Sequence, residues 1–186
     1  MSLSEAIQLR RSIKRFTDRA VSREQIGSLI SAATAAPNHH LTQPWRFYIL
    51  GPEARYAYGL ALGDRKARKL EDPEAARAVR EKVAGEHRAL PCMIAVAVVT
   101  NENPETREED YAAVMMGVEN LAIVAVEMGL GTHIKTGAIM GDPAARVAAG
   151  VGDAERIVMV VNVGEPAEVP PPRKREPASS FTIWVP

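Results

Sequence analysis

The chain has 186 residues, 46% of them hydrophobic and 25% charged, a composition typical of a globular protein rather than of a disordered or fibrous one. Its 23 basic residues balance 23 acidic ones, so the molecule as a whole does not attract nucleic acid or an anionic membrane. The length suits a single domain over residues 1–186, and any anion site must come from a local cluster of cations.

The first residues and the single cysteine give an indication of the cellular compartment of the protein. Residues 1–5 lack the basic segment of a signal peptide, and no apolar run is long enough to span a membrane. Cys92 cannot form an internal disulfide. It lies in an apolar run, where we expect a packed core residue rather than a nucleophile. These features favour a cytoplasmic protein.

Two helices are predicted before the first strand. Leu3 and Ile7 indicate a short helix that leads into the basic segment 10–15. A second helix follows Ser22, because a serine with Gln25 three residues later has the spacing of a capping box, and apolar residues then recur on one face. A Pro-Asn pair ends this helix.

The middle of the chain alternates between strand and helix patterns. β-Branched and aromatic residues predict a strand over 45–50. Residues 53–89 are rich in helix formers and are interrupted at Asp72-Pro73, where aspartate can cap and proline can open a new helix. The valine-rich run 92–100 predicts a fully buried strand. Apolar residues at helical spacing over 107–128 predict the longest helix, with apolar positions on more than one side.

The last third repeats this alternation. Gly129 ends the long helix, Asp142-Pro143 opens a short one, and residues 157–163 predict another buried strand. The proline-rich tail is expected to pack on something, and a partner subunit is one candidate, because it carries Phe181, Ile183 and Trp184. Intermixed helices and strands indicate an α/β or α+β sandwich. Glycine-rich nucleotide loops, zinc-ligand spacings and nucleophile elbows are absent.

Two clusters of cations stand out against the balanced charge. Residues 10–14 place two guanidinium groups, a hydroxyl and an ammonium within five positions, enough donors to surround a phosphate monoester. Residues 173–175 are three consecutive cations flanked by prolines, where a restricted backbone loses less entropy on binding an anion. Either cluster alone is also typical of a solvated surface. The residues are Arg10, Arg11, Ser12, Lys14, Arg173, Lys174 and Arg175.

Residues 36–47 concentrate polar side chains in a loop directly before the first predicted strand. Loops in such places often carry binding sites. In the structural alternative, Asn38 caps a turn, Gln43 satisfies local backbone groups and Trp45 anchors the core. The two adjacent histidines have no Cys, Asp or Glu at a ligand spacing, so no metal site is expected.

Three motifs, in this order, resemble the FMN-dependent nitroreductase family. The first is Arg10-Arg11-Ser12-Ile13-Lys14-Arg15-Phe16. The second runs from Ala36-Pro37 to Gln43-Pro44-Trp45-Arg46-Phe47. The third is Gly129-Leu130-Gly131, with Gly164-Glu165-Pro166 downstream. Each motif alone is weakly specific, whereas the ordered set spans nearly the whole chain, and the short length is similar to that of compact family members.

The resemblance implies an α+β sandwich, with a central, mostly antiparallel sheet flanked by helices. It further implies an intertwined homodimer with two FMN sites, each built from both chains at the subunit interface. The FMN phosphate would be held by Arg10, Ser12, Arg173 and Arg175, with Arg11 contributing from the same turn. Lys14 would lie near the flavin N1 and O2 edge, where a cation stabilises the negative charge of reduced flavin.

The resemblance also assigns the remaining flavin contacts. His39 and its loop would approach the flavin from the other subunit. Ile134, Lys135 and Thr136 match the family stretch whose backbone faces the isoalloxazine ring, where an N–H can bond N5. The sequence departs here from the Glu-Gly pair of many longer members, and a surface lysine is the alternative for Lys135. The mid-chain Asn and Lys that contact the pyrimidine edge in longer relatives have no evident match.

The implied activity is NAD(P)H-dependent reduction of nitroaromatics, quinones or similar electron-poor small molecules, by ping-pong hydride transfer through FMN. No nucleophilic or acid–base side chain is then required. A flavin-binding or flavin-handling protein with little turnover would use the same anchors, and other reductive chemistries use the same fold. A nucleic-acid-binding module is disfavoured by the zero net charge. The expected partners are a second copy of the chain and a small acceptor.

Overall fold

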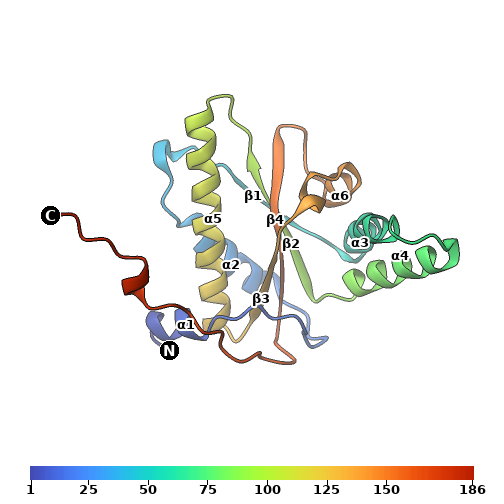
Figure 1. The fold of residues 1–186 in the computed structure, drawn as a ribbon, viewed down its shortest axis with the longest axis horizontal. Helices are drawn as coiled ribbons and strands as arrows, with labels where there is room; N and C mark the ends of the chain where they lie inside the picture. Colours follow the sequence, from blue (N-terminus) through green and yellow to red (C-terminus); the bar gives the residue numbers. More distant parts are fainter.

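A four-stranded antiparallel sheet forms the centre of the computed structural model, which describes all residues 1–186. The strands lie in the order β1 (Trp45–Ile49), β2 (Cys92–Val99), β4 (Glu155–Gly164) and β3 (Gly131–Lys135) (Figure 1). Each neighbouring pair is antiparallel. The expected α+β class is therefore confirmed, and β1 and β3 are the edge strands.

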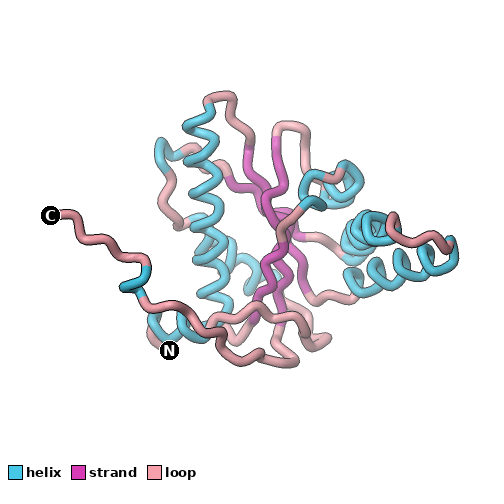
Figure 2. Tube along the Cα trace, viewed as in Figure 1, coloured by secondary structure: helices cyan, strands magenta, loops and turns pink.

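Helices cover both faces of this sheet (Figure 2). The pair α2 and α5 packs on one face, and α3 and α6 pack on the other, with α4 outside against α3 (Figure 1). The helices are α1 (Leu3–Leu9), α2 (Arg23–Thr34), α3 (Pro52–Ala67), α4 (Pro73–Arg88), α5 (Pro104–Glu127) and α6 (Pro143–Ala149). None of them combines the length and the hydrophobicity that a membrane crossing requires.

The central position of β2 in the sheet explains why its sequence is apolar without alternation. Ile94 and Val96 face the core under α2 and α5, whereas Met93 and Ala95 face the core under α3 and α6. All four are fully buried, because successive side chains of a strand point to opposite faces and both faces are covered here. Cys92 is also buried, and burial raises the pKa of its thiol to about 11. The prediction of a packed core cysteine is confirmed.

Local capping sets where several helices begin, as the sequence predicts. The Ser22 hydroxyl accepts from the backbone N–H of Gln25 at 3.1 Å, while the Gln25 side chain accepts from the Ser22 N–H at 3.0 Å. The carboxylates of Asp72 and Asp142 accept from the first backbone N–H groups of α4 and α6. Helix α5 starts three residues before the predicted 107, because Asn103 caps it.

Two parts of the chain differ from the expectations. Strand β3 was not predicted as a strand, since it is short and lacks an apolar run. The C-terminal tail extends away from the body of the molecule (Figure 1). Phe181, Ile183 and Trp184 are 76%, 88% and 90% exposed, so their expected packing is not made within one chain.

Candidate functional site

The basic segment, residues 10–16, leaves α1 and runs along the open edge of β3. The backbone N–H of Ile13 donates to the carbonyl oxygen of Thr132 at 2.9 Å, and Ser12 bridges Thr132 in a parallel sense. Ile13 is buried, whereas Ser12 and Lys14 on either side of it are exposed. This strand-like alternation anchors the segment through one apolar side chain and directs its polar groups outward.

The residues that follow β4 are fastened to the same segment. Phe16 and Pro166 form an antiparallel bridge, and the Ala167 N–H donates to the Arg15 carbonyl oxygen at 3.0 Å. The Thr17 N–H donates to the carbonyl oxygen of Glu165 at 2.9 Å. These contacts bring the proline-rich tail, and with it the second cation cluster, beside the first.

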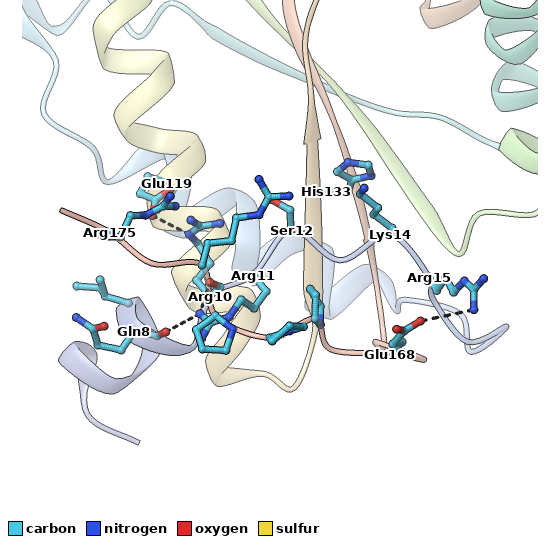
Figure 3. A pocket seen from close by; sticks show the side chains of 15 residues that line it. Gln8, Arg10, Arg11, Ser12, Lys14, Arg15, Glu119, His133, Glu168 and Arg175 are labelled. Atoms are coloured by element: carbon cyan, nitrogen blue, oxygen red, sulfur yellow. Dashed lines mark hydrogen bonds and ion pairs between the residues drawn. The ribbon is translucent and has the colours of Figure 1, made fainter.

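A cavity of about 970 Å³ lies between α1, the basic segment, β3, α5 and the tail (Figure 3). It contains all six residues that the two clusters contributed to the predicted site: Arg10, Arg11, Ser12, Lys14, Arg173 and Arg175. Lys174 does not line it. With Arg15, six cations face two carboxylates, those of Glu119 and Glu168. The excess of positive charge suits an anionic ligand.

Two of the arginines are already held by other groups of the chain. Arg10 Nε lies 3.2 Å from Glu119 Oε1, and the side chain of Arg10 is 24% exposed. Arg11 Nη1 donates to the carbonyl oxygens of Gln8 at 2.6 Å and Arg10 at 2.9 Å. Glu119 therefore orients one guanidinium at the cavity, while Arg11 is partly engaged in capping the end of α1 (Figure 3).

The backbone of β3 beyond Thr132 faces an open edge. Thr132 directs its carbonyl oxygen away from β4, toward Ile13. Because the backbone groups of an antiparallel edge strand alternate in direction, those of Ile134 and Thr136 face the same edge. No strand pairs there. The side chain of Ile134 packs against the core under α5, so only its backbone is available at this edge.

Lys135 lies on the face of β3 that is turned toward α4. Its Nζ is 3.3 Å from Nε2 of His87, whose Nδ1 lies 2.7 Å from the Val83 carbonyl oxygen. In that arrangement His87 is neutral, with Nδ1 donating and Nε2 accepting. Burial lowers the pKa of both Lys135 and His87. Lys135 is half-buried rather than fully exposed, and its side chain does not reach the cavity.

His39 lies away from the cavity of its own chain. It sits in a short 3-10 turn, His39–Leu41, with Nδ1 2.9 Å from Oε1 of Glu109. Glu109 and the cavity residue Glu119 are ten positions apart on α5, about 15 Å along the helix axis. The fold does not bring His39 together with the phosphate-side residues of the same chain.

The loop that carries His39 is held in an unusual backbone conformation. His40, Leu41 and Gln43 have φ values of 60°, 51° and 47°. Thr42 donates to the buried Asp110 of α5. Glu109, His39 and His40 place possible ligand atoms within 4.8 Å of one another, so the fold supplies an acid that sequence spacing did not reveal. The three side chains are not deeply buried, and the His39–Glu109 hydrogen bond and the stacking of His39 on His40 account for their proximity.

Sequence reasoning missed four polar residues that line the cavity: Gln8, Glu119, His133 and Glu168. Glu119 could have been noticed in the sequence, because it is the one charged residue in the apolar stretch 111–126 of α5. His133 could not. It is half-buried on β3, and burial, with Lys135 and Lys14 nearby, lowers the pKa of its imidazole.

Comparison with known proteins places this geometry in context. A sequence model described as "Nitroreductase family" matches residues 7–165. The Bacillus subtilis protein named "Putative NAD(P)H nitroreductase YfhC" is 31% identical over 175 residues, covering 94% of this chain and 90% of that protein. The structure of a nitroreductase-like family protein from Bacillus cereus superposes with a TM-score of 0.85 at 28% identity, covering 100% and 96% of the two chains. NfnB of Sphigopyxis sp. strain HMH, an FMN- and NADPH-dependent nitroreductase, gives a TM-score of 0.78 at 19% identity over 100% of both chains.

Proposed function

The chain belongs to the nitroreductase family, and from this membership we propose that it is an FMN-dependent oxidoreductase that uses NAD(P)H to reduce small electron-poor compounds. Residues 1–186 would form one FMN-binding domain. The observation that carries the proposal is the cavity, where cations from both ends of the chain meet around one space. The cofactors of NfnB support it, since that enzyme shares the fold.

The residues present fit the phosphate of FMN. A phosphate monoester needs several donors and a positive surrounding, and the cavity offers Arg10, Ser12, Arg173 and Arg175. Arg10 is preorientated by Glu119, which lowers the entropy lost on binding. Arg11 contributes charge from the same turn, although part of its guanidinium is engaged with backbone carbonyls.

The flavin ring would extend from the phosphate along β3. Lys14 lines the cavity with no carboxylate paired to it, so its charge is available to the N1 and O2 edge of the ring. The open-edge backbone at Ile134 and Thr136 offers an N–H donor for N5. Lys135 would support this stretch rather than contact the ring, because its ammonium is directed to His87 and its backbone groups face β4.

A second copy of the chain would complete the site. The cavity lining includes only one hydrophobic residue, Ile7, apart from three prolines of the tail, so this chain alone offers little surface to cover the faces of a flavin ring. Exposed apolar side chains on α1, α5 and the tail are available for an interface: Leu3, Leu9, Met116, Phe181 and Trp184. We propose an intertwined homodimer in which His39 and its loop approach the partner's flavin.

When bound, FMN would supply the redox chemistry, passing a hydride from NAD(P)H to the acceptor through its N5 atom. The chain's own residues would anchor the phosphate, orient the flavin ring and tune its reduction potential. Lys14 stabilises negative charge at the pyrimidine edge, and the β3 backbone fixes the ring against the sheet. Donor and acceptor would occupy the same place in turn, and nitroaromatics or quinones are the proposed acceptors.

The visible absorption spectrum of the purified protein is the first test. We expect one FMN per chain, released by heating and identified by chromatography, and steady NAD(P)H oxidation in the presence of a nitroaromatic or a quinone. A colourless protein that cannot be reconstituted with FMN would contradict the proposal. FMN binding without NAD(P)H turnover would instead indicate a protein that handles flavin.

A further inference from the structure

We infer that His133 is a proton-uptake site coupled to reduction of the bound flavin, taking up one proton when the flavin gains negative charge and releasing it on reoxidation. The inference rests on the proposed function, because it requires FMN in the cavity. It concerns a residue that lies beside Lys14, at the end of the cavity away from the Arg10–Glu119 pair (Figure 3).

His133 reaches the cavity from the sheet. Residues 133 and 135 share one face of β3, and residues 132 and 134 share the other, so His133 points to the side of Lys135 rather than into the α5 core. Its side chain is half-buried and contributes to the cavity wall. An ionisable imidazole is thus placed where a flavin ring would lie between the phosphate anchors and the β3 edge.

The charges that face His133 are positive. Lys14 approaches from the basic segment and Lys135 from β3 itself, and these two cations, after burial, hold the pKa of His133 below its ordinary value. From the helices α3 and α4, Lys66 and Glu86 act on Lys135 rather than on His133. With no anion in the cavity, the imidazole is therefore neutral at lower pH than a free histidine.

The remaining elements around the cavity add no acid beside His133. The carboxylate of Glu168 in the tail pairs with Arg15, and that of Glu119 in α5 pairs with Arg10. A negative charge on a bound ligand would balance the positive charges of Lys14 and Lys135 that face His133. An anion at this position raises the pKa of a neighbouring imidazole, because opposite charges favour the ionised form.

Asn162 offers an acceptor for the proton that His133 would gain. It lies directly opposite His133 in the β3–β4 pairing, so the two side chains share one face of the sheet with Cβ atoms about 5 Å apart. Asn162 is 3% exposed, and its Oδ1 has no hydrogen-bond partner. Buried acceptors of this kind are normally satisfied. A protonated imidazole has an N–H on both nitrogens and can donate to this oxygen.

The proton and electron balance is complete with the proposed donor. NAD(P)H transfers two electrons and one proton as hydride to flavin N5, which leaves NAD(P)⁺ and one net negative charge on the flavin. A proton from solvent then protonates His133 and balances that charge. When an acceptor takes the hydride, the charge disappears and His133 returns its proton to the acceptor or to solvent.

The test is the pH dependence of the flavin reduction potential in the FMN-loaded protein, measured anaerobically against redox dyes. In the wild type we expect the equilibrium constant for two-electron reduction to fall a hundredfold for each unit that the pH rises, between the pKa of His133 with oxidised flavin and its higher pKa with reduced flavin. His133→Gln should give a tenfold fall there, since one proton fewer is taken up. At about 30 mV per tenfold change, the slopes are about 60 and 30 mV per pH unit.

Glu71→Gln is the control, because Glu71 is an exposed ionisable residue that lies outside both the cavity and the loop of His39. It should keep the wild-type slope. Equal slopes in the wild type and His133→Gln would overturn the inference, even with FMN fully bound. Failure to bind FMN would be visible first, as a colourless protein, and would count against the proposed function instead.

A second measurement does not depend on a variant. The histidine ring protons of the wild type, followed by NMR against pH, should include one imidazole whose pKa rises by at least one unit when the flavin is reduced. If no histidine pKa rises on reduction, the inference is wrong.

Discussion

Lys14, Arg173 and Arg175 line the cavity without a carboxylate partner, whereas Arg10 and Arg15 are each paired with one. An unpaired cation contributes its full charge to a bound anion, while a paired one contributes mainly through its orientation. At the scale of single residues, the sequence predicted which cations belong to one site, and they line one cavity, but it could not distinguish paired from unpaired ones.

Arg10→Ala and Arg175→Ala should each weaken FMN binding without unfolding the apoprotein. Either change removes a charge-assisted phosphate contact of about 1.5 to 3 kcal/mol, so the Kd should rise about 10- to 100-fold. Quenching of FMN fluorescence during titration measures it. Lys174→Ala is the control, because this exposed lysine lies between two cavity residues but does not line the cavity. Unchanged affinity in both arginine variants would contradict the phosphate assignment.

At the scale of elements, the contact between β3 and the basic segment holds the candidate site together. Gly131 makes this contact possible, since a Cβ there would lie 2.9 Å from Cβ of Ile13 and closer still to its Cγ1. Ile13 is buried against this glycine, and its neighbours Ser12 and Lys14 take their direction from it. The glycine of the third motif, Gly131, is therefore required for the packing of Ile13 in the first motif.

Gly131→Ala should destabilise the protein and weaken FMN binding together. The added methyl group overlaps Ile13, which costs about 1 to 3 kcal/mol and shifts the basic segment. Urea unfolding of the apoprotein and FMN titration measure the two effects. Gly27→Ala is a matched control: nothing lies within 4 Å of a Cβ there, so the change should stabilise helix α2 by about 0.5 to 1 kcal/mol. Wild-type stability and FMN affinity of Gly131→Ala would show that the close approach is unimportant.

At the scale of the whole molecule, one chain leaves apolar surface without a partner. The tail residues Ile183 and Trp184 are 88% and 90% exposed, and Met116 on α5 is 43% exposed. Exposed apolar residues of this size are typical of an interface. A second copy that covers them would also supply the flavin site with the apolar contacts its lining lacks.

Deletion of residues 177–186 should shift the protein from dimer toward monomer and lower its FMN content. The deleted residues include the most exposed apolar side chains but leave Arg173 and Arg175 in place, so a loss of FMN would reflect the interface rather than the phosphate contacts. Light scattering coupled to size-exclusion chromatography gives the mass. A shortened protein that remains a dimer with full FMN would contradict this role of the tail.

Contacts within a few residues were predictable from the sequence. The capping pair Ser22–Gln25 and the caps at Asp72 and Asp142 join neighbours along the chain, so the start of each helix is encoded locally. The burial of Cys92 on a strand covered on both faces follows from its apolar run. The two cation clusters were visible for the same reason, because their residues are adjacent.

Only the tertiary structure decided which distant residues meet. Arg10 pairs with Glu119, His39 with Glu109, and His133 lies opposite Asn162, and none of these pairs is adjacent in sequence. The short strand β3 exists because β4 supplies its hydrogen bonds, not because its own residues specify it. Long-range contacts depend on how the helices and strands pack, and a local pattern does not contain that information.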